Sequence, residues 1–167
     1  KWDKVINVYS SQNVAAKKYY SEILNGTHKA VAVDIGWAGS GAMALSHLVE
    51  DVWKIPCTLT GLIAGTNTIY NAEPDASEPF LQSGKLVAYL YSQSHNRDLL
   101  KKHDLNKDYN VFWELLLSSP TPQFSGFKLG NVARKDSDDV YLKDIDVTLQ
   151  YGKYDANQEG IKDVQSG

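Results

Sequence analysis

The 167-residue sequence predicts an α/β domain with a mainly parallel sheet and an irregular C-terminal strand region. The first observation behind this is a short apolar run, Ala30–Val33, followed by a glycine-rich loop and an amphipathic helix. The second is another apolar run at Thr58–Ala64. A strand, a helix and a strand in this order form a βαβ unit with parallel strands. Continuous apolar runs are typical of strands buried on both faces, so we expect a three-layer, Rossmann-like arrangement.

The remaining elements follow from the spacing of the apolar residues. Apolar positions about 3.6 residues apart indicate helices, and strict alternation with polar residues indicates a half-exposed strand. Asn25-Gly26 ends the first helix, and Pro56 follows the second. Helices are expected over residues 5–24, 42–53, 96–103 and 109–117, and further strands over residues 86–91 and 145–151. We expect the helix over residues 109–117 to be buried, because its composition is densely apolar.

The composition is that of an ordinary globular chain, with 43% hydrophobic and 22% charged residues. The length suits one domain, so we expect residues 1–167 to form a single domain. The start at Lys1 and the polar end suggest a fragment of a longer polypeptide, whose other domains would be partners. The net charge of −3 argues against nucleic acid as a partner. Without an apolar run of about 18 residues or a signal peptide, we expect no membrane span and a cytoplasmic location.

The glycine loop carries the strongest chemical signal. Gly36, Gly39 and Gly41 lie between a strand and a helix, where backbone N–H groups can approach an anion closely. The dipole at the start of the helix favours a phosphate or carboxylate there. Ser40 can add a hydroxyl donor or cap the helix. Asp34, at the end of the strand, can orient the loop or accept a hydrogen bond from a sugar hydroxyl.

Several ligands fit this loop incompletely, and no cofactor follows from it. The glycine order is GxxGxG rather than the dinucleotide-binding GxGxxG, and no acidic residue ends the strand at Ala64. The Walker pattern lacks its Gly-Lys-Ser/Thr. Asp34-Ile35-Gly36 also resembles the first motif of S-adenosylmethionine-dependent methyltransferases, with one extra residue. A non-catalytic interaction module, in which the glycines only form a turn and pack closely, remains a further alternative.

Other polar residues are weaker candidates. Ser92 and His95 follow an apolar strand, as site residues often do, although a capped helix start explains them equally well. Glu114 lies among large apolar residues, and we expect its carboxylate to be buried and paired. Asp144 and Asp146 form a DxDxT pattern, but they fall on the polar side of an alternating strand. The histidines lack zinc-ligand spacing, so no metal site is expected.

Three stretches of the sequence resemble one family. They are Val33-Asp34-Ile35-Gly36-Trp37-Ala38-Gly39-Ser40, then Glu114–Pro120 with Ser125-Gly126-Phe127, and Gln158–Asp163. They resemble the C-terminal region of predicted HAD-superfamily hydrolases that are associated with glycosyltransferases in bacterial surface-polysaccharide biosynthesis. The resemblance implies a glycan-biosynthesis domain that binds a phosphorylated sugar or a nucleotide-sugar. The rival enzymatic interpretation is a small S-adenosylmethionine-dependent methyltransferase or half of a glycosyltransferase. The family's Asp-x-Asp-Thr nucleophile strand has no counterpart in this chain, so we expect no phosphate hydrolysis from it alone.

Overall fold

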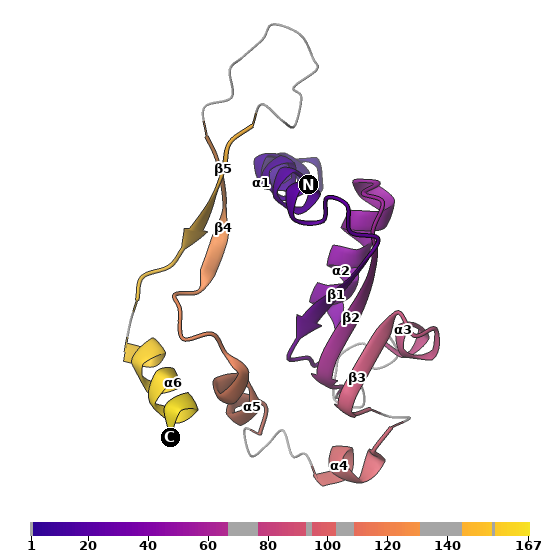
Figure 1. The fold of residues 1–167 in the computed structure, drawn as a ribbon, viewed down its shortest axis with the longest axis vertical. Helices are drawn as coiled ribbons and strands as arrows, with labels where there is room; N and C mark the ends of the chain where they lie inside the picture. Colours follow the sequence, from indigo (N-terminus) through magenta and orange to yellow (C-terminus); the bar gives the residue numbers. More distant parts are fainter. Residues whose placement is uncertain (1, 67–76, 93–94, 103–108, 131–144, 155) are drawn as a thin grey trace, which may run out of the picture. The chain divides into compact units, whose positions relative to one another are not determined.

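The computed structural model describes residues 2–66, 77–92, 95–102, 109–130, 145–154 and 156–167. Contacts along the chain define two compact units. One unit is formed by Gly26–Ser118, and the other combines Lys1–Asn25 with Ser119–Gly167. Figure 1 traces the order of the elements through both units.

The unit formed by Gly26–Ser118 is built on a parallel three-stranded sheet with the strand order β1-β2-β3. Its predicted strand–helix–strand order is confirmed, and so are the third strand and the two later helices. The helix after the glycine loop is α-helical first and then changes to a π-helical turn, η1. The elements are β1 (Lys29–Asp34), α2 (Ser40–His47), η1 (Leu48–Val52), β2 (Thr58–Gly65), α3 (Glu78–Gln82), β3 (Leu86–Tyr91), α4 (Arg97–Lys102) and α5 (Tyr109–Leu117).

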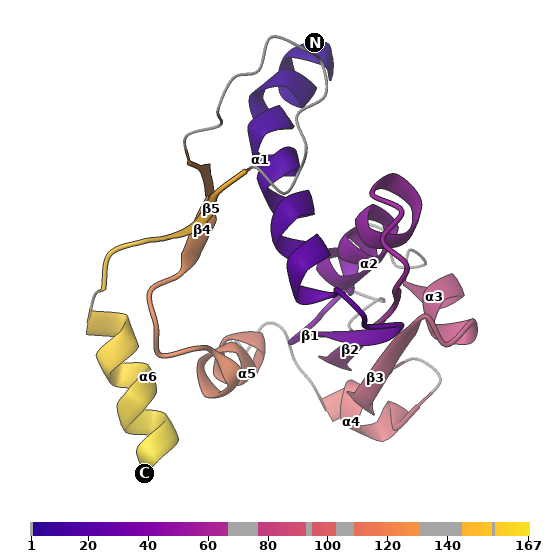
Figure 2. The same ribbon diagram turned by 45° about the horizontal axis from the view of Figure 1, so that its top comes forward.

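One face of this sheet carries the core of the unit. Ala42 and Met43 of α2 pack against Ile63 of β2 and Leu86 of β3, and all four are buried. Leu81 of α3 packs against the same cluster. Figure 2 shows α2 and α3 on the same side of the strands. The helices that connect the strands therefore cover a single face, which we call the inner face.

The opposite, outer face of the sheet is exposed and apolar. Val33, Leu62 and Val87 are aligned across the three strands, and the side chains of Val33 and Val87 are 73% and 43% exposed. The prediction that β1 is buried on both faces was therefore wrong. The run Ala30–Val33 alternates alanines on the inner face with valines on the outer face. Because both residue types are apolar, hydrophobicity alone does not tell the covered face from the exposed one. Within the described residues of this unit, the fold is α/β, with α2 and α3 on the inner face of the parallel sheet.

The expected burial of α5 was also wrong for the side chains that the structure describes. Val111, Leu115, Leu116 and Leu117 are between 39% and 49% exposed. An apolar segment gains free energy by burial only where another surface covers it. Among the described elements, no strand packs along α5.

The carboxylate of Glu50 links η1 to the sheet. Oε1 of Glu50 accepts hydrogen bonds from the Ser46 hydroxyl at 3.0 Å and from the backbone N–H of Leu59 at 2.8 Å, and it forms an ion pair with Lys85. Partial burial raises the pKa of Glu50, but the hydrogen bonds from Lys85, Leu59 and Ser46 outweigh it and leave this pKa below its ordinary value. The cluster links three segments of the unit at one charged group.

The second unit holds a separate antiparallel sheet. Its elements are α1 (Trp2–Ile23), β4 (Phe124–Leu129), β5 (Val147–Tyr151) and α6 (Ala156–Ser166). The side-chain amide of Gln12 in α1 bonds to both the N–H and the C=O of Phe127, at 2.8 and 2.6 Å. The predicted helix and C-terminal strand are confirmed, whereas β4 was not predicted. Asp146 is exposed as expected, and Asp144 lies outside the described residues.

None of the helices in the described ranges combines the length and apolarity needed to cross a membrane.

Candidate functional site

The glycine loop lies at the carboxyl end of β1, and two of its glycines are required by packing. A Cβ atom on Gly36 would lie 2.5 Å from the carbonyl oxygen of Gly65, so the loop and β2 approach each other too closely for a side chain. Gly39 has φ of 70° at the N-cap of α2, and a Cβ atom there would meet Leu86 at 2.6 Å. Both glycines therefore have a structural reason for their presence.

Gly41 has no such reason. It is exposed in the first turn of α2 and lies outside the left-handed region, and a Cβ atom on it would meet only Oδ2 of Asp34, at an ordinary 3.5 Å. A helix interior favours alanine over glycine by about 1 kcal/mol. Packing in the folded chain therefore does not explain why this residue is a glycine.

The start of α2 has no side-chain cap. Gly39 occupies the N-cap position without a side-chain hydrogen bond, so the alternative in which Ser40 caps the helix was wrong. Ser40 is instead the first helical residue, and it is exposed. The carboxylate of Asp34 lies beside Gly41, where the positive end of the helix dipole stabilises a negative charge. An anion bound here would therefore share this helix end with a carboxylate.

Trp37 connects the loop to Glu114. The half-buried indole donates a hydrogen bond from Nε1 to Oε1 of Glu114 at 3.2 Å. The ring also stacks on Tyr91, with ring centroids 6.3 Å apart and an angle of 19° between the planes. Glu114 is exposed, so the expected burial of its carboxylate was wrong, because α5 itself is exposed. The carboxylate is nevertheless paired, with an indole rather than a cation.

Tyr91 joins the carboxyl ends of the strands. Its side chain is 3% exposed, and burial raises the pKa of its hydroxyl above the ordinary value. The ring covers Gly65, where a Cβ atom would lie 2.6 Å away. Its backbone carbonyl accepts a hydrogen bond from the N–H of Thr66 at 3.2 Å. The hydroxyl of Thr66 is fully buried and has no hydrogen-bond partner among the described residues.

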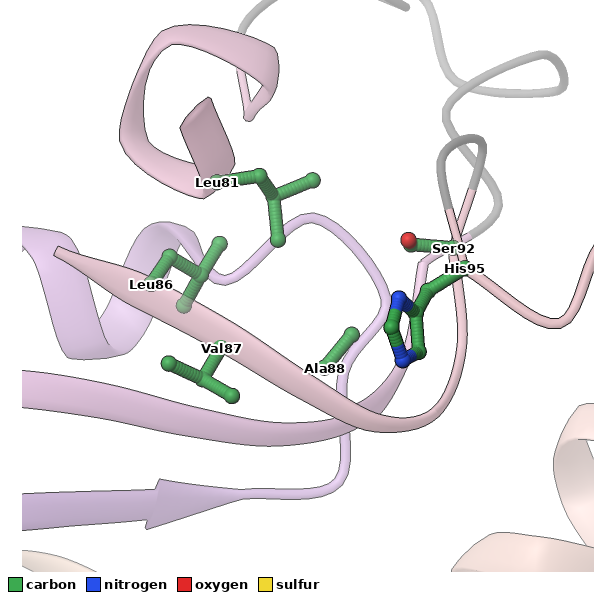
Figure 3. Close-up of a pocket in the computed structure, with 6 residues that line it drawn as sticks. All are labelled: Leu81, Leu86, Val87, Ala88, Ser92 and His95. Carbon is green, nitrogen blue, oxygen red and sulfur yellow. The ribbon is translucent and has the colours of Figure 1, made fainter. Parts of the chain in front are cut away.

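Ser92 and His95 line a pocket beside β3 (Figure 3). Figure 3 shows both side chains at one end of the pocket. The turn that carries them is closed by backbone hydrogen bonds in both directions, at 2.7 and 3.4 Å. The volume of about 180 Å³ is smaller than the roughly 300–1,000 Å³ of most ligand pockets. The lining residues are Leu81, Leu86, Val87, Ala88, Ser92 and His95.

Two contacts connect the pocket with the glycine loop. Leu86 lines the pocket and lies against Gly39, while Tyr91, next to Ser92 in the sequence, stacks on Trp37. The candidate residues therefore form two neighbouring groups at the carboxyl edge of the sheet. Those from the loop are Asp34, Gly36, Gly39, Ser40 and Gly41, joined by Glu114, and those from the pocket are Ser92 and His95.

Sequence reasoning missed Trp37, Tyr91 and Thr66. Each lies within four residues of the end of a strand, and that position is the signal that could have identified them. His47 is exposed as predicted, and its ring nitrogen lies 2.9 Å from Asp51. In the described part of the chain, no group of three histidine, cysteine or carboxylate side chains could hold a metal ion.

No protein-family model, curated protein or solved structure matches the chain.

Proposed function

We propose that the chain is a domain of a surface-glycan biosynthesis protein that binds a phosphorylated sugar or a nucleotide-sugar at the carboxyl edge of its parallel sheet. The observation that carries the proposal is Gly41, an exposed helical glycine that packing does not require, beside the carboxylate of Asp34. A glycine at such a point allows a ligand to approach the backbone closely. Open parallel sheets bind their ligands at this edge.

The hydrogen-bond donors and acceptors of the loop suit two different parts of such a ligand. The uncapped N–H groups in the first turn of α2 and the Ser40 hydroxyl are donors, which suit phosphate oxygens. An ionised Asp34 carboxylate only accepts hydrogen bonds, so it suits a sugar hydroxyl and repels phosphate. We therefore expect the phosphate on the Ser40 side and the sugar on the Asp34 side.

The sequence resemblance supports the glycan pathway, and the pocket at Ser92 and His95 offers additional room beside the loop. The proposal includes a Rossmann-like arrangement in which a further layer covers the outer face of the sheet. Parallel sheets are almost always covered on both faces, which is the physical reason for this part of the proposal.

Calorimetric titration of the full chain tests the proposal. The probes are glucose, galactose and N-acetylglucosamine 1-phosphates, UDP-glucose and inorganic phosphate. We expect at least one sugar phosphate or nucleotide-sugar to bind, and Gly41→Ala to weaken that binding at least tenfold. The same substitution should stabilise the fold by about 0.5–1 kcal/mol, because alanine favours a helix.

Gly160→Ala is the matched control. Gly160 lies in α6, where a Cβ atom would meet nothing within 4 Å, so this variant gains the same helix propensity far along the sequence from the loop. It should leave binding unchanged. The proposal fails if the wild-type chain binds none of the probes, or if Gly41→Ala binds as tightly as the wild type.

A further inference from the structure

We propose that Trp37 and Glu114 form a subsite for the uncharged, hydroxyl-bearing ring of the ligand. The sugar ring packs on the indole of Trp37 and donates a hydrogen bond to the carboxylate of Glu114. This inference rests on the proposed function and assigns the sugar part of the ligand to residues 77 positions apart in the sequence.

The indole is already fixed in place before any ligand binds. Tyr91, itself 3% exposed, stacks on one side of the ring, and Glu114 accepts a hydrogen bond from its Nε1. A side chain held at two points loses little conformational freedom on binding, so more of the contact energy appears as affinity. Trp37 is half-buried despite these contacts, which leaves part of the indole exposed to a ligand.

The charges favour a polyhydroxylated ring over a phosphate at this position. Ionised Glu114 and Asp34 are acceptors only, and neither forms an ion pair with a described lysine or arginine. A phosphate placed beside either carboxylate would meet a negative charge. Sugar hydroxyls are donors and carry no charge, so they satisfy the carboxylates without this repulsion.

A buried hydroxyl lies at the same edge of the sheet. Oγ1 of Thr66 is fully buried without a hydrogen-bond partner in the described part of the chain, and its residue is bonded through its N–H to Tyr91. Buried polar atoms are almost always hydrogen-bonded, so an orphaned one calls for a partner.

The experiment compares charged and uncharged probes on the same variants. The full chain is titrated with the sugar 1-phosphate that binds best, the methyl glycoside of the same sugar, inorganic phosphate and UMP. We expect Trp37→Leu and Glu114→Gln each to weaken the sugar phosphate and the methyl glycoside about tenfold or more, as expected for loss of a charged hydrogen bond or an aromatic contact. Binding of inorganic phosphate should stay unchanged.

Glu159→Gln is the matched control, because Glu159 is an exposed carboxylate that also accepts a hydrogen bond from an aromatic residue, Tyr154, at 2.8 Å. It should bind every probe as the wild type does. Glu114→Gln keeps an oxygen that can accept the bond from Trp37, so it reports on ligand binding even if Trp37→Leu does not fold.

Two results would overturn the subsite while leaving the proposed function intact. In the first, the sugar phosphate binds equally well to the wild type, Trp37→Leu and Glu114→Gln. In the second, UMP binds as tightly as UDP-glucose and loses affinity in Trp37→Leu, which would mean that a base occupies the indole. If no sugar phosphate binds to the wild type, the proposed function fails and this inference fails with it.

Discussion

Glu50 and Lys85 lie 35 residues apart in the sequence and form a partly buried ion pair that joins η1 to the residue before β3. The same carboxylate oxygen accepts hydrogen bonds from Ser46 and from the backbone of Leu59. One oxygen atom thus satisfies three donors from different segments.

We predict that Glu50→Gln lowers the free energy of unfolding by about 1–3 kcal/mol, because the uncharged amide oxygen loses the ion pair with Lys85 and accepts weaker hydrogen bonds from Ser46 and Leu59. Chemical denaturation of both proteins measures the difference. Asp51→Asn is the control. Asp51 is an exposed neighbour whose carboxylate pairs with the exposed ring of His47, so loss of its charge should cost less than about 0.5 kcal/mol. Equal costs for the two variants would contradict the prediction.

The same pair predicts how stability depends on acidity. The pKa of Glu50 is lower in the folded chain than the ordinary value of 4.5, so the unfolded chain binds a proton there more readily. Its contribution is therefore present above pH 4.5 and is lost as the pH falls through the folded pKa. Denaturation curves at a series of pH values below 6 should show a steeper acid loss for the wild type than for Glu50→Gln. Parallel curves would show that Glu50 does not contribute.

Tyr91 predicts a dependence on alkaline pH. Burial raises the pKa of its hydroxyl above 10.0, so the folded chain retains a proton that the unfolded chain releases. The Tyr91 hydroxyl should leave the free energy of unfolding unchanged below pH 10 and lower it as the pH rises above 10. Tyr91→Phe should remove part of this fall. Ultraviolet titration of phenolate absorbance measures this ionisation directly. If the wild type showed a tyrosine ionising below pH 10 that Tyr91→Phe lacks, the burial of this hydroxyl would be contradicted.

Gly39 and Gly84 form a matched pair for measuring crowding at the loop. Both have φ near 70°, but a Cβ atom on Gly39 would meet Leu86 at 2.6 Å, whereas one on Gly84 would meet nothing within 4 Å. Gly84→Ala should cost about 1–2 kcal/mol for the left-handed backbone alone. Gly39→Ala should cost about 1–3 kcal/mol more, because it also overpacks the core. Equal losses in thermal or chemical denaturation would place Leu86 away from the loop.

Val33 and Ile63 test which face of the sheet is covered. Val33 is 73% exposed on the outer face, and Ile63 is fully buried on the inner face. Val33→Ala should change the free energy of unfolding by less than about 0.5 kcal/mol, and Ile63→Ala should lower it by about 2–5 kcal/mol. Because Val33 is exposed in this chain, the third layer of the proposed arrangement would come from a partner. A loss above 1 kcal/mol for Val33→Ala would instead show that the chain itself covers the outer face.

The order of strands and helices was predictable because local periodicity determines it. The apolar runs at Ala30–Val33 and Thr58–Ala64 became parallel neighbours, as a βαβ unit requires. The burial of Val33 and of α5 was not predictable, since an apolar pattern shows a preference for burial and not the surface that provides it. β4 was missed because its residues, Phe124–Leu129, do not alternate clearly. Its partners, β5 and the Gln12 side chain, are also distant in the sequence.

The candidate site was predictable at the loop and incomplete elsewhere. Strand ends and glycines in the sequence pointed to Asp34 and Gly41, because these signals are local. The partnership of Trp37 with Glu114 and Tyr91 depends on distant segments meeting at one edge, which local spacing does not encode.

Large side chains on β3 lie opposite glycines on the neighbouring segments. Leu86 fills the space left by Gly39 and Gly61, and Tyr91 fills the space left by Gly65. The side-chain volumes at these paired positions are thus complementary, although the positions are far apart in the chain. Changing one partner alone would create either a clash or a void. In a genetic selection for restored folding, compensating changes for these glycines should appear on β3, so the loop and the third strand would have to vary together.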